Sequence, residues 1–453
     1  MRSLLALSLV LGAASPLAAQ SRADLVKRLD SLAGAPVQEG RAVGIAVAIV
    51  KGPDTLLLKG YGKADVEWNV PMPADALFEI GSVTKQFTAA SILQLRDEGK
   101  LSLDDDLSKY FPNFPTNGNR IPLRRLLDHT SGIKGITEIP EFRDLSVRTL
   151  PRDSAIALIA RYPFDFKTGE AMIYNNSAFL LLGHIIEKVS GMSYEDYIEK
   201  KIFAPLGMKR SMYCNSAESV ERRAHGYGYE GTTVRRASQN VHVWPFSAGS
   251  ICSTPGDLIT WLEALHGGKV LTPKSYAEMT TPSKLNDGTP IRYGMGIAVG
   301  TDQAGHKEIG HGGGIDGFVS QASWYPEEKL AIVVLMNSNG PVSPGALASE
   351  LSRAILPVVP PTPVLVFKAD ATPLVGTYSG PSRGRVMDVV VTSSPQGLSA
   401  AVNGNQPRQL LWVEGWTFRV GNSYLTFKKG DSSLAGELRF DGGGGLYVLK
   451  RKS

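Results

Sequence analysis

Phe78-Glu79-Ile80-Gly81-Ser82-Val83-Thr84-Lys85 opens an amphipathic segment that predicts a helix from Ser82 to Glu98, ended by Gly99. Residues i and i+3 of a helix face the same side, so the Ser82 hydroxyl should lie beside the Lys85 amine. A desolvated lysine can lose its proton and act as a base for a serine nucleophile. The stretch therefore predicts a nucleophilic serine, and the alternative is a helix-capping serine beside a solvated lysine.

Two other serines occur in contexts that resemble nucleophile motifs. Ser131-Gly132-Ile133-Lys134 repeats the Ser-x-x-Lys spacing, but Gly132 and the nearby Gly135 favour a turn. Gly-x-Ser-x-Gly occurs once, at residues 380–384, where a strand-like run follows. A nucleophile elbow needs a helix at that point. We therefore predict the nucleophile at Ser82.

A Ser–Lys nucleophile also needs a second proton carrier and an electropositive edge for the substrate. Tyr174-Asn175-Asn176 offers a phenol and an amide just before a predicted helix over 178–189. His311-Gly312-Gly313 offers a polar side chain, then residues small enough for a substrate to approach the backbone. Taken separately, the first is equally typical of a turn with a packed ring and the second of a hairpin turn.

Taken in order, these three segments resemble the motifs of the serine β-lactamase and penicillin-binding-protein superfamily. The similar branch contains class C β-lactamases, D-alanyl-D-alanine carboxypeptidases, D-aminopeptidases and related esterases. The resemblance runs from about residue 35 to 355 and includes Leu126–Gly132, Gly183–Glu187, Leu206–Met208, Ala248–Ser250 and Gly310–Gly313. It implies an α+β, β-lactamase-like fold, with an antiparallel sheet flanked by helices and a helical subdomain across the cleft.

The resemblance also implies roles for individual residues. Ser82 would be the acylated nucleophile, and Lys85 and Tyr174 would share the proton transfers. The implied substrate-binding and oxyanion-hole groups are Asn176, His311 and Gly313, and the backbone N–H groups of Ser82 and Gly314. The resemblance implies no metal and no organic cofactor.

The third motif departs from the common pattern. His311 stands where many members of the superfamily have Lys, and histidine is charged only near or below a pKa of about 6.5. This counts against efficient use of β-lactams or acyl-D-Ala-D-Ala, which carry carboxylates. Lys167-Thr168-Gly169 mimics the common third motif, but it lies in the loop leading to Tyr174, and we interpret it as a decoy.

The composition and the chain ends predict an exported protein of several parts. The chain has 453 residues, of which 43% are apolar, and a net charge of +5, which excludes a disordered chain and gives no case for nucleic acid. We expect a signal peptide at 1–19, cut after Ala19, and find no later apolar run long enough to span a membrane. The expected location is therefore periplasmic or secreted.

Three further segments follow the signal peptide in this prediction. Residues 20–355 form the β-lactamase-like part, 356–370 a Pro-rich linker, and 371–453 a small antiparallel β domain, either a barrel or a sandwich. Cys214 and Cys252 can pair in an oxidising compartment or stay as separate buried thiols, and the sequence leaves this open.

The predicted function is that of an exported serine hydrolase which cleaves peptide, amide or ester bonds through an acyl-serine. A D-amino-acid peptidase or carboxypeptidase, or a β-lactamase-like hydrolase, is the main interpretation. The alternatives are a carboxylesterase of the same fold and a non-turnover protein that binds penicillin or cell-wall peptide. The expected partner is a small peptide, ester or β-lactam substrate, and the oligomeric state is open.

Overall fold

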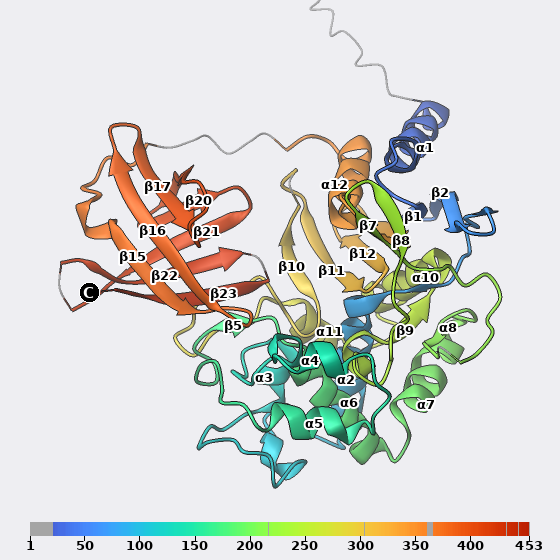
Figure 1. Ribbon diagram of the computed structural model, residues 1–453, viewed down its shortest axis with the longest axis horizontal. Coiled ribbons are helices and arrows are strands. Elements are labelled where there is room, and N and C mark those ends of the chain that lie inside the picture. The colour runs from blue at the N-terminus through green and yellow to red at the C-terminus, as the bar shows by residue number, and fades with distance from the viewer. Residues whose placement is uncertain are drawn as a thin grey trace, which may run out of the picture.

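The computed structural model describes residues 21–215, 217–302, 304–359, 366–431, 433–442 and 444–452. The predicted signal peptide and part of the Pro-rich linker lie outside these residues. A central sheet with helices on both faces forms one part of the molecule, and a second sheet built by the C-terminal strands lies beside it (Figure 1).

The central sheet is antiparallel and combines strands from both ends of the β-lactamase-like segment. Its order is β10-β11-β12-β13-β1-β2-β3. The strands are β1 (Gly44–Lys51), β2 (Asp54–Asp65), β3 (Val70–Pro71), β10 (Ala298–Thr301), β11 (Lys307–Ile315), β12 (Phe318–Tyr325) and β13 (Leu330–Met336). β1 and β13 pair at the centre, with Ile45 opposite Met336.

The two faces of the central sheet are covered by different helices. Ile45, Val47 and Ile49 point to a core shared with α1 (Arg22–Gln38) and α12 (Pro344–Ile355). Ala46 and Ala48 point to the opposite face, where they join the large core that contains the helical subdomain. Both faces are therefore buried, which explains why nearly every residue of β1 is apolar.

The helical subdomain packs around two helices that run directly from predicted site segments. These are α2 (Thr84–Asp97) and α6 (Asn176–Ser190). The remaining α-helices of this part are α3 (Leu123–Leu127), α4 (Phe142–Leu145), α5 (Asp153–Ile159), α7 (Tyr194–Ile198), α8 (Ala204–Leu206), α9 (Phe246–Gly249), α10 (Pro255–His266) and α11 (Pro273–Thr280). The Phe87 ring of α2 stacks on Trp261 of α10 with centroids 4.0 Å apart. Dense packing of this kind fixes the start of each helix, where the site residues lie.

The predicted helix at Ser82 differs from the structure in its first turn. Gly81–Val83 is a 3-10 turn (η1), and the α-helix begins only at Thr84. The cause is Gly81, whose φ of 50° does not fit a right-handed helix. The hydroxyl of Ser82 is thereby offset from the axis of α2 while still lying one turn before Lys85.

The C-terminal strands form a nearly closed antiparallel sheet, called the C-terminal barrel here. Its strands are β15 (Gly376–Pro381), β16 (Val386–Ser394), β17 (Gly397–Val402), β18 (Arg408–Gln409), β19 (Leu411–Glu414), β20 (Thr417–Val420), β21 (Ser423–Lys429), β22 (Ala435–Gly442) and β23 (Gly445–Arg451). Tyr378, Phe418, Phe427 and Leu449 lie in its apolar interior. The alternation seen in the sequence thus corresponds to one set of inward-facing side chains.

The C-terminal barrel is joined to the rest of the molecule by strand pairing. β5 (Met172–Ile173) pairs with β23, with Ile173 opposite Gly445 and Met172 opposite Leu446. Figure 1 shows β5 and β23 side by side at this junction. The Asp287 carboxylate also accepts from Arg439 and Lys428 of the barrel at 2.6 Å each, which strongly lowers the pKa of Asp287. The barrel is therefore fixed against the segment that immediately precedes Tyr174.

A small sheet behind the nucleophile carries the two cysteines. β9 (Ile251–Ser253) pairs with β4 (Phe78–Glu79) and with β6 (Met212–Tyr213). Cys214 and Cys252 form a disulfide across this sheet, which settles the question that the sequence left open. None of the helices in the described residues has the length and apolar character needed to cross a membrane.

Candidate active site

Ser82 lies where the 3-10 turn meets the edge of β11. The Ile80 N–H donates to the Ile251 carbonyl at 3.0 Å, and the Ile80 carbonyl accepts from Ser320 Oγ at 2.8 Å. A Cβ placed on Gly81 would lie 2.8 Å from the Gly314 nitrogen, so only glycine allows this approach. The backbone around Ser82 and that of Gly314 are thus side by side, as an oxyanion hole requires.

Lys85 is fully buried, and three oxygens surround its amine. Nζ lies 3.2 Å from Ser82 Oγ, 2.8 Å from Asn176 Oδ1 and 2.7 Å from the Ala248 carbonyl oxygen. No carboxylate accompanies these contacts, so burial lowers the pKa of Lys85 well below its usual value, and the positive charge of Arg383 lowers it further. The structure therefore favours a neutral amine beside the serine hydroxyl.

Tyr174 and Asn176 are held in place by the start of α6. The intervening Asn175 side chain caps the helix by accepting from Ala178 N at 2.9 Å. The Tyr174 ring lies 4.9 Å from Lys85 Nζ. Its hydroxyl oxygen is buried and lacks a hydrogen-bond partner among the described residues. Burial raises the pKa of Tyr174, while Ser82 and Arg383 oppose part of that rise.

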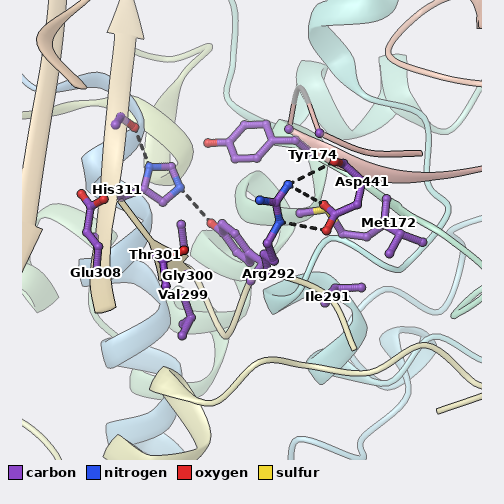
Figure 2. A pocket seen from close by; sticks show the side chains of 18 of the residues that line it. Met172, Tyr174, Ile291, Arg292, Val299, Gly300, Thr301, Glu308, His311 and Asp441 are labelled. Atoms are coloured by element: carbon purple, nitrogen blue, oxygen red, sulfur yellow. Dashed lines mark hydrogen bonds and ion pairs between the residues drawn. The ribbon is translucent and has the colours of Figure 1, made fainter. Parts of the chain in front are cut away.

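His311 completes the group, but not as a cation. Its Nδ1 lies 2.5 Å from the Gly312 carbonyl oxygen, to which it donates, and its Nε2 lies 2.9 Å from the Tyr293 hydroxyl (Figure 2). Both ring nitrogens of His311 are therefore engaged within the protein. Burial lowers the pKa of His311 to about 3, with a further contribution from Lys85. Burial therefore disfavours the charged form of His311 beyond what the ordinary pKa of histidine does.

Two cavities meet at these residues. One of about 790 Å³ is lined by Ser82, Asn176 and Gly314 together with apolar side chains that include Phe142 and Trp244. The other, of about 410 Å³, is lined by Tyr174 and His311 and by Asp441–Gly442 and Gly444–Leu446 of the C-terminal barrel; Tyr174 extends from beside Asp441 toward His311 (Figure 2). The predicted site residues therefore line two cavities, a larger one with mixed apolar and polar walls and a smaller one partly walled by the barrel.

The remaining serine candidates have structural partners instead. Lys134 pairs with Asp165 at 2.9 Å, and Ser131 lies in a turn, so the second Ser-x-x-Lys is not a nucleophile pair. Thr168 donates to the Ser131 carbonyl at 2.9 Å, in agreement with its interpretation as a decoy. Ser382 lies in the turn between β15 and β16, where its hydroxyl donates to the Arg385 carbonyl at 3.1 Å.

Sequence reasoning missed several groups at the site. His129 packs against the Tyr174 ring with centroids 4.3 Å apart, and its Nδ1 accepts from Asn175 N at 3.0 Å. The Tyr174 N–H donates to the Gly444 carbonyl of the C-terminal barrel at 3.1 Å. Arg383 of the barrel lies 5.4 Å from the centroid of the same ring. No pattern in the sequence pointed to these contacts, because they join distant segments.

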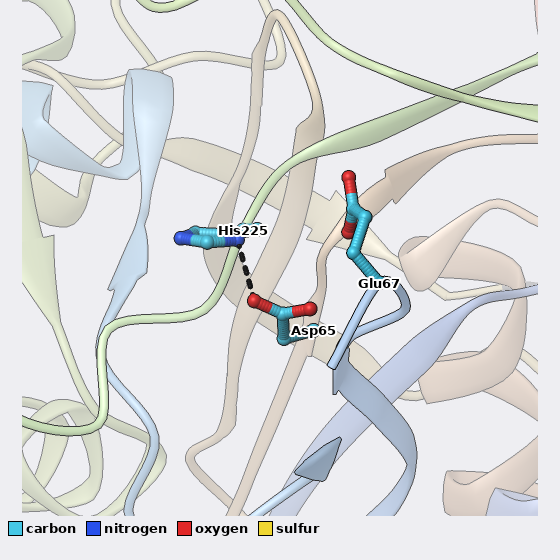
Figure 3. A group of neighbouring side chains, drawn as sticks. All are labelled: Asp65, Glu67 and His225. Atoms are coloured by element: carbon cyan, nitrogen blue, oxygen red, sulfur yellow. Dashed lines mark ion pairs between the residues drawn. The ribbon is translucent and has the colours of Figure 1, made fainter. Parts of the chain in front are cut away.

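One group in the described residues has the spacing of metal ligands, away from the residues above. It consists of Asp65, Glu67 and His225 (Figure 3). His225 Nδ1 lies 3.0 Å from Asp65 Oδ2, and Glu67 accepts from the Tyr227 hydroxyl at 2.5 Å. Each member already has a protein partner, so the group gives no reason to place a metal ion there.

Comparison with known proteins agrees with this geometry. The chain is similar to penicillin-binding protein 4* of Bacillus subtilis, with 27% identity over 64% of this chain and 67% of that protein. D-amino acid amidase from Ochrobactrum anthropi SV3, solved with L-phenylalanine, has 28% identity and a TM-score of 0.64, over 73% of this chain and 98% of the amidase. The octameric penicillin-binding protein homologue from Pyrococcus abyssi has 25% identity and a TM-score of 0.63, over 94% of this chain and 100% of the homologue.

The similarity to the amidase covers about three quarters of the chain, whereas that to the archaeal homologue covers nearly all of it. The family description "Beta-lactamase" matches residues 29–356, which hold every predicted site residue. The fold is the predicted α+β arrangement, and the chain is a β-lactamase-fold hydrolase related to penicillin-binding proteins and D-amino acid amidases. The protein belongs to the Beta-lactamase family.

Proposed function

We propose that this protein is an exported serine hydrolase that cleaves peptide or amide bonds next to D-amino acids through an acyl-Ser82 intermediate. The observation that carries the proposal is the environment of Lys85, a buried amine 3.2 Å from the Ser82 hydroxyl with no carboxylate in hydrogen-bond contact. Such an amine can take the serine proton near neutral pH.

The contacts of Lys85 support its role as the base. Asn176 Oδ1 and the Ala248 carbonyl accept hydrogen bonds, at 2.8 and 2.7 Å. A neutral amine has two N–H groups, and these two acceptors engage both. The lone pair is then left for the proton of Ser82, which becomes a stronger nucleophile as it attacks the substrate carbonyl.

The other residues supply the rest of an acyl-transfer reaction. The backbone N–H groups of Ser82 and Gly314 stabilise the oxyanion. The Tyr174 hydroxyl, buried beside Ser82, donates a proton to the leaving nitrogen or oxygen and is reprotonated from Lys85. Asn176 and His311, with the backbone of Gly313, hold the substrate along the edge of β11. Water then attacks the acyl-enzyme in the reverse sequence of proton transfers.

The substrate class and location rest on different observations. Similarity to a D-amino acid amidase and to a penicillin-binding protein favours substrates with D-amino acids. The disulfide between Cys214 and Cys252 supports an oxidising compartment, in keeping with the predicted signal peptide. A periplasmic or secreted peptidase of this type would meet short peptides from the cell wall.

The test is covalent labelling followed by turnover. A fluorophosphonate should add to the wild-type protein and not to Ser82→Ala, as measured by intact mass. A panel of D-aminoacyl amides, their L enantiomers, nitrocefin and p-nitrophenyl esters should show preference for the D-aminoacyl amides. Equal labelling of both proteins would refute the assignment of Ser82. A stable adduct with no turnover of any substrate would instead identify a binding protein that acylates and stalls.

A carboxylesterase is the second candidate, and the large cavity favours it. That cavity combines about 790 Å³ with apolar side chains such as Phe142, Val147 and Trp244, which suit an uncharged acyl group. Higher kcat/KM for p-nitrophenyl butyrate than for every D-aminoacyl amide would support this candidate.

A further inference from the structure

Substrates of a D-peptidase often carry a carboxylate, yet the third motif offers no charge for one. His311 is neutral, and both of its ring nitrogens are engaged, by the Gly312 carbonyl and the Tyr293 hydroxyl. Lys85 is buried and its amine is occupied by oxygens of the protein. If a carboxylate binds near Ser82, its counter-ion must come from outside the three motifs.

The C-terminal barrel brings an arginine to this position. Arg383 lies at the tip of the turn between β15 and β16, which is closed by a hydrogen bond from Ser382 N to the Arg385 carbonyl at 2.8 Å. Gly384 follows with a φ of 67°, and a Cβ there would lie 2.9 Å from the Cβ of Glu138. The turn therefore packs directly against the Glu138 segment of the helical subdomain.

Glu138 holds the Arg383 guanidinium without using all of its donors. Nε and Nη2 of Arg383 both donate to Oε1 of Glu138, at 3.2 and 3.1 Å. A guanidinium has five N–H donors, and its Nη1 makes no hydrogen bond to a described residue. The Glu138 side chain is 10% exposed and that of Arg383 is 41% exposed, so the pair is anchored on one side and open to solvent on the other.

Arg383 also lies close to the predicted catalytic residue Tyr174. Its Cζ lies 5.4 Å from the centroid of the Tyr174 ring. Glu138 also accepts from Thr137 Oγ1 at 3.0 Å, and Thr137 in turn accepts from Asn176 Nδ2 at 3.4 Å. Arg383 is thus linked to Thr137 of the larger cavity through Glu138, and it lies over the ring of Tyr174, which lines the smaller one. Its charge also lowers the pKa of Lys85 and of Tyr174, which fits this closeness.

We propose that Arg383 binds a carboxylate of the substrate and takes the place of the cation that His311 does not provide. The proposal rests on the proposed acyl-transfer function of Ser82 and assigns the class of ligand, a peptide with a free carboxylate. Guanidinium is suited to this, because it presents parallel N–H groups to a carboxylate while remaining charged at every relevant pH. Arg383 is then a specificity-determining residue supplied by the C-terminal barrel.

The test compares two peptides that differ only in charge at one end. N-acetyl-D-alanyl-D-alanine and its C-terminal carboxamide are used as competitors of p-nitrophenyl ester hydrolysis, so each gives an inhibition constant whether or not it is cleaved. The wild type should bind the carboxylate more tightly. In Arg383→Met its inhibition constant should rise roughly 10- to 100-fold, and that of the carboxamide by less than about threefold.

Two further variants separate charge from structure. Arg385→Met removes an exposed arginine of the same turn and should leave both inhibition constants unchanged. Arg383→Lys keeps the positive charge but loses the paired N–H groups of the guanidinium. It should therefore retain part of the preference for the carboxylate peptide over the carboxamide. Equal inhibition by both peptides in the wild type, or an equal change for both in Arg383→Met, would overturn the proposal while ester turnover still upheld acyl transfer by Ser82. Absence of ester turnover and of Ser82 labelling would refute both.

Discussion

The close approach of the backbone of Gly81 to that of Gly314 would set the position of the proposed oxyanion hole, and substitution of Gly81 by alanine tests this role. A Cβ on Gly81 would lie 2.8 Å from the Gly314 nitrogen, whereas ordinary contact begins at about 3.4 Å. The two segments would have to separate by about 0.6 Å. Misplacement of about 1 Å can cost a reaction 100-fold, so we expect kcat/KM for a p-nitrophenyl ester to fall roughly 10- to 100-fold.

Gly99 provides the matched control, because it lies at the other end of α2. Its φ is 72°, close in kind to the 50° of Gly81, but a Cβ there would meet nothing within 4 Å. Both alanine variants should lose about 1–2 kcal/mol of unfolding free energy from backbone strain, measured by urea titration, and Gly81→Ala should lose more because its Cβ also clashes with Gly314. Only Gly81→Ala should lose activity and react slowly with the fluorophosphonate. If Gly81→Ala were acylated at the wild-type rate, the backbone of Gly314 would not contribute to the oxyanion hole.

Three other outcomes follow from the same structure. Lys85→Ala and Tyr174→Phe should each lower kcat at least about 100-fold with little change in KM, measured on the best ester; normal turnover of either variant would remove that residue from the proton transfers. Burial lowers the pKa of His266 to about 3 in the folded protein, whereas in the unfolded chain this histidine takes up a proton below about pH 6.5. The free energy of unfolding should therefore fall as the pH falls from 6.5, by about 2 kcal/mol at pH 5. His266→Phe keeps the stacking on Trp324 and should flatten this dependence in thermal unfolding at pH 7 and pH 5, and an unchanged slope would contradict the assignment. The double variant Cys214→Ser with Cys252→Ser opens a loop of 38 residues, so its free energy of unfolding, measured by denaturant titration, should fall by about 4 kcal/mol. A fall of less than about 1 kcal/mol would contradict this prediction.

Local pattern was sufficient to predict the helices that begin near Ser82 and near Ala178, and it pointed to the three candidate site segments. Ser82 and Lys85 are three residues apart, and helical geometry brings them together whatever surrounds them. Periodicity similarly predicted the helix at 178–189, and the structure extends it only to Asn176–Ser190. These features depend on neighbours in the chain, which the sequence displays directly.

Features that depend on distant segments were not predictable in this way. The engagement of both ring nitrogens of His311 requires Tyr293 at its Nε2, and the burial that lowers its pKa arises only when the fold is complete. Arg383 and Glu138 are 245 residues apart, and no spacing rule joins them. The sequence predicted that Gly380–Gly384 is not a nucleophile elbow, but it gave no indication of a role for Arg383. Nothing in the local sequence shows that this turn reaches Tyr174.

The residues proposed for catalysis and those proposed for substrate selectivity are encoded in two separate regions of the gene. The pairing of β5 with β23 brings these regions together in the folded protein. The proposed nucleophile and its proposed base are encoded early, whereas part of the wall of the smaller cavity and the arginine over the Tyr174 ring are encoded near the end. Substitutions in a few codons of two barrel turns can thus alter which molecules are accepted without disturbing the bond-breaking residues. Proteins of this architecture can therefore evolve a new substrate range while the reaction at the serine stays the same.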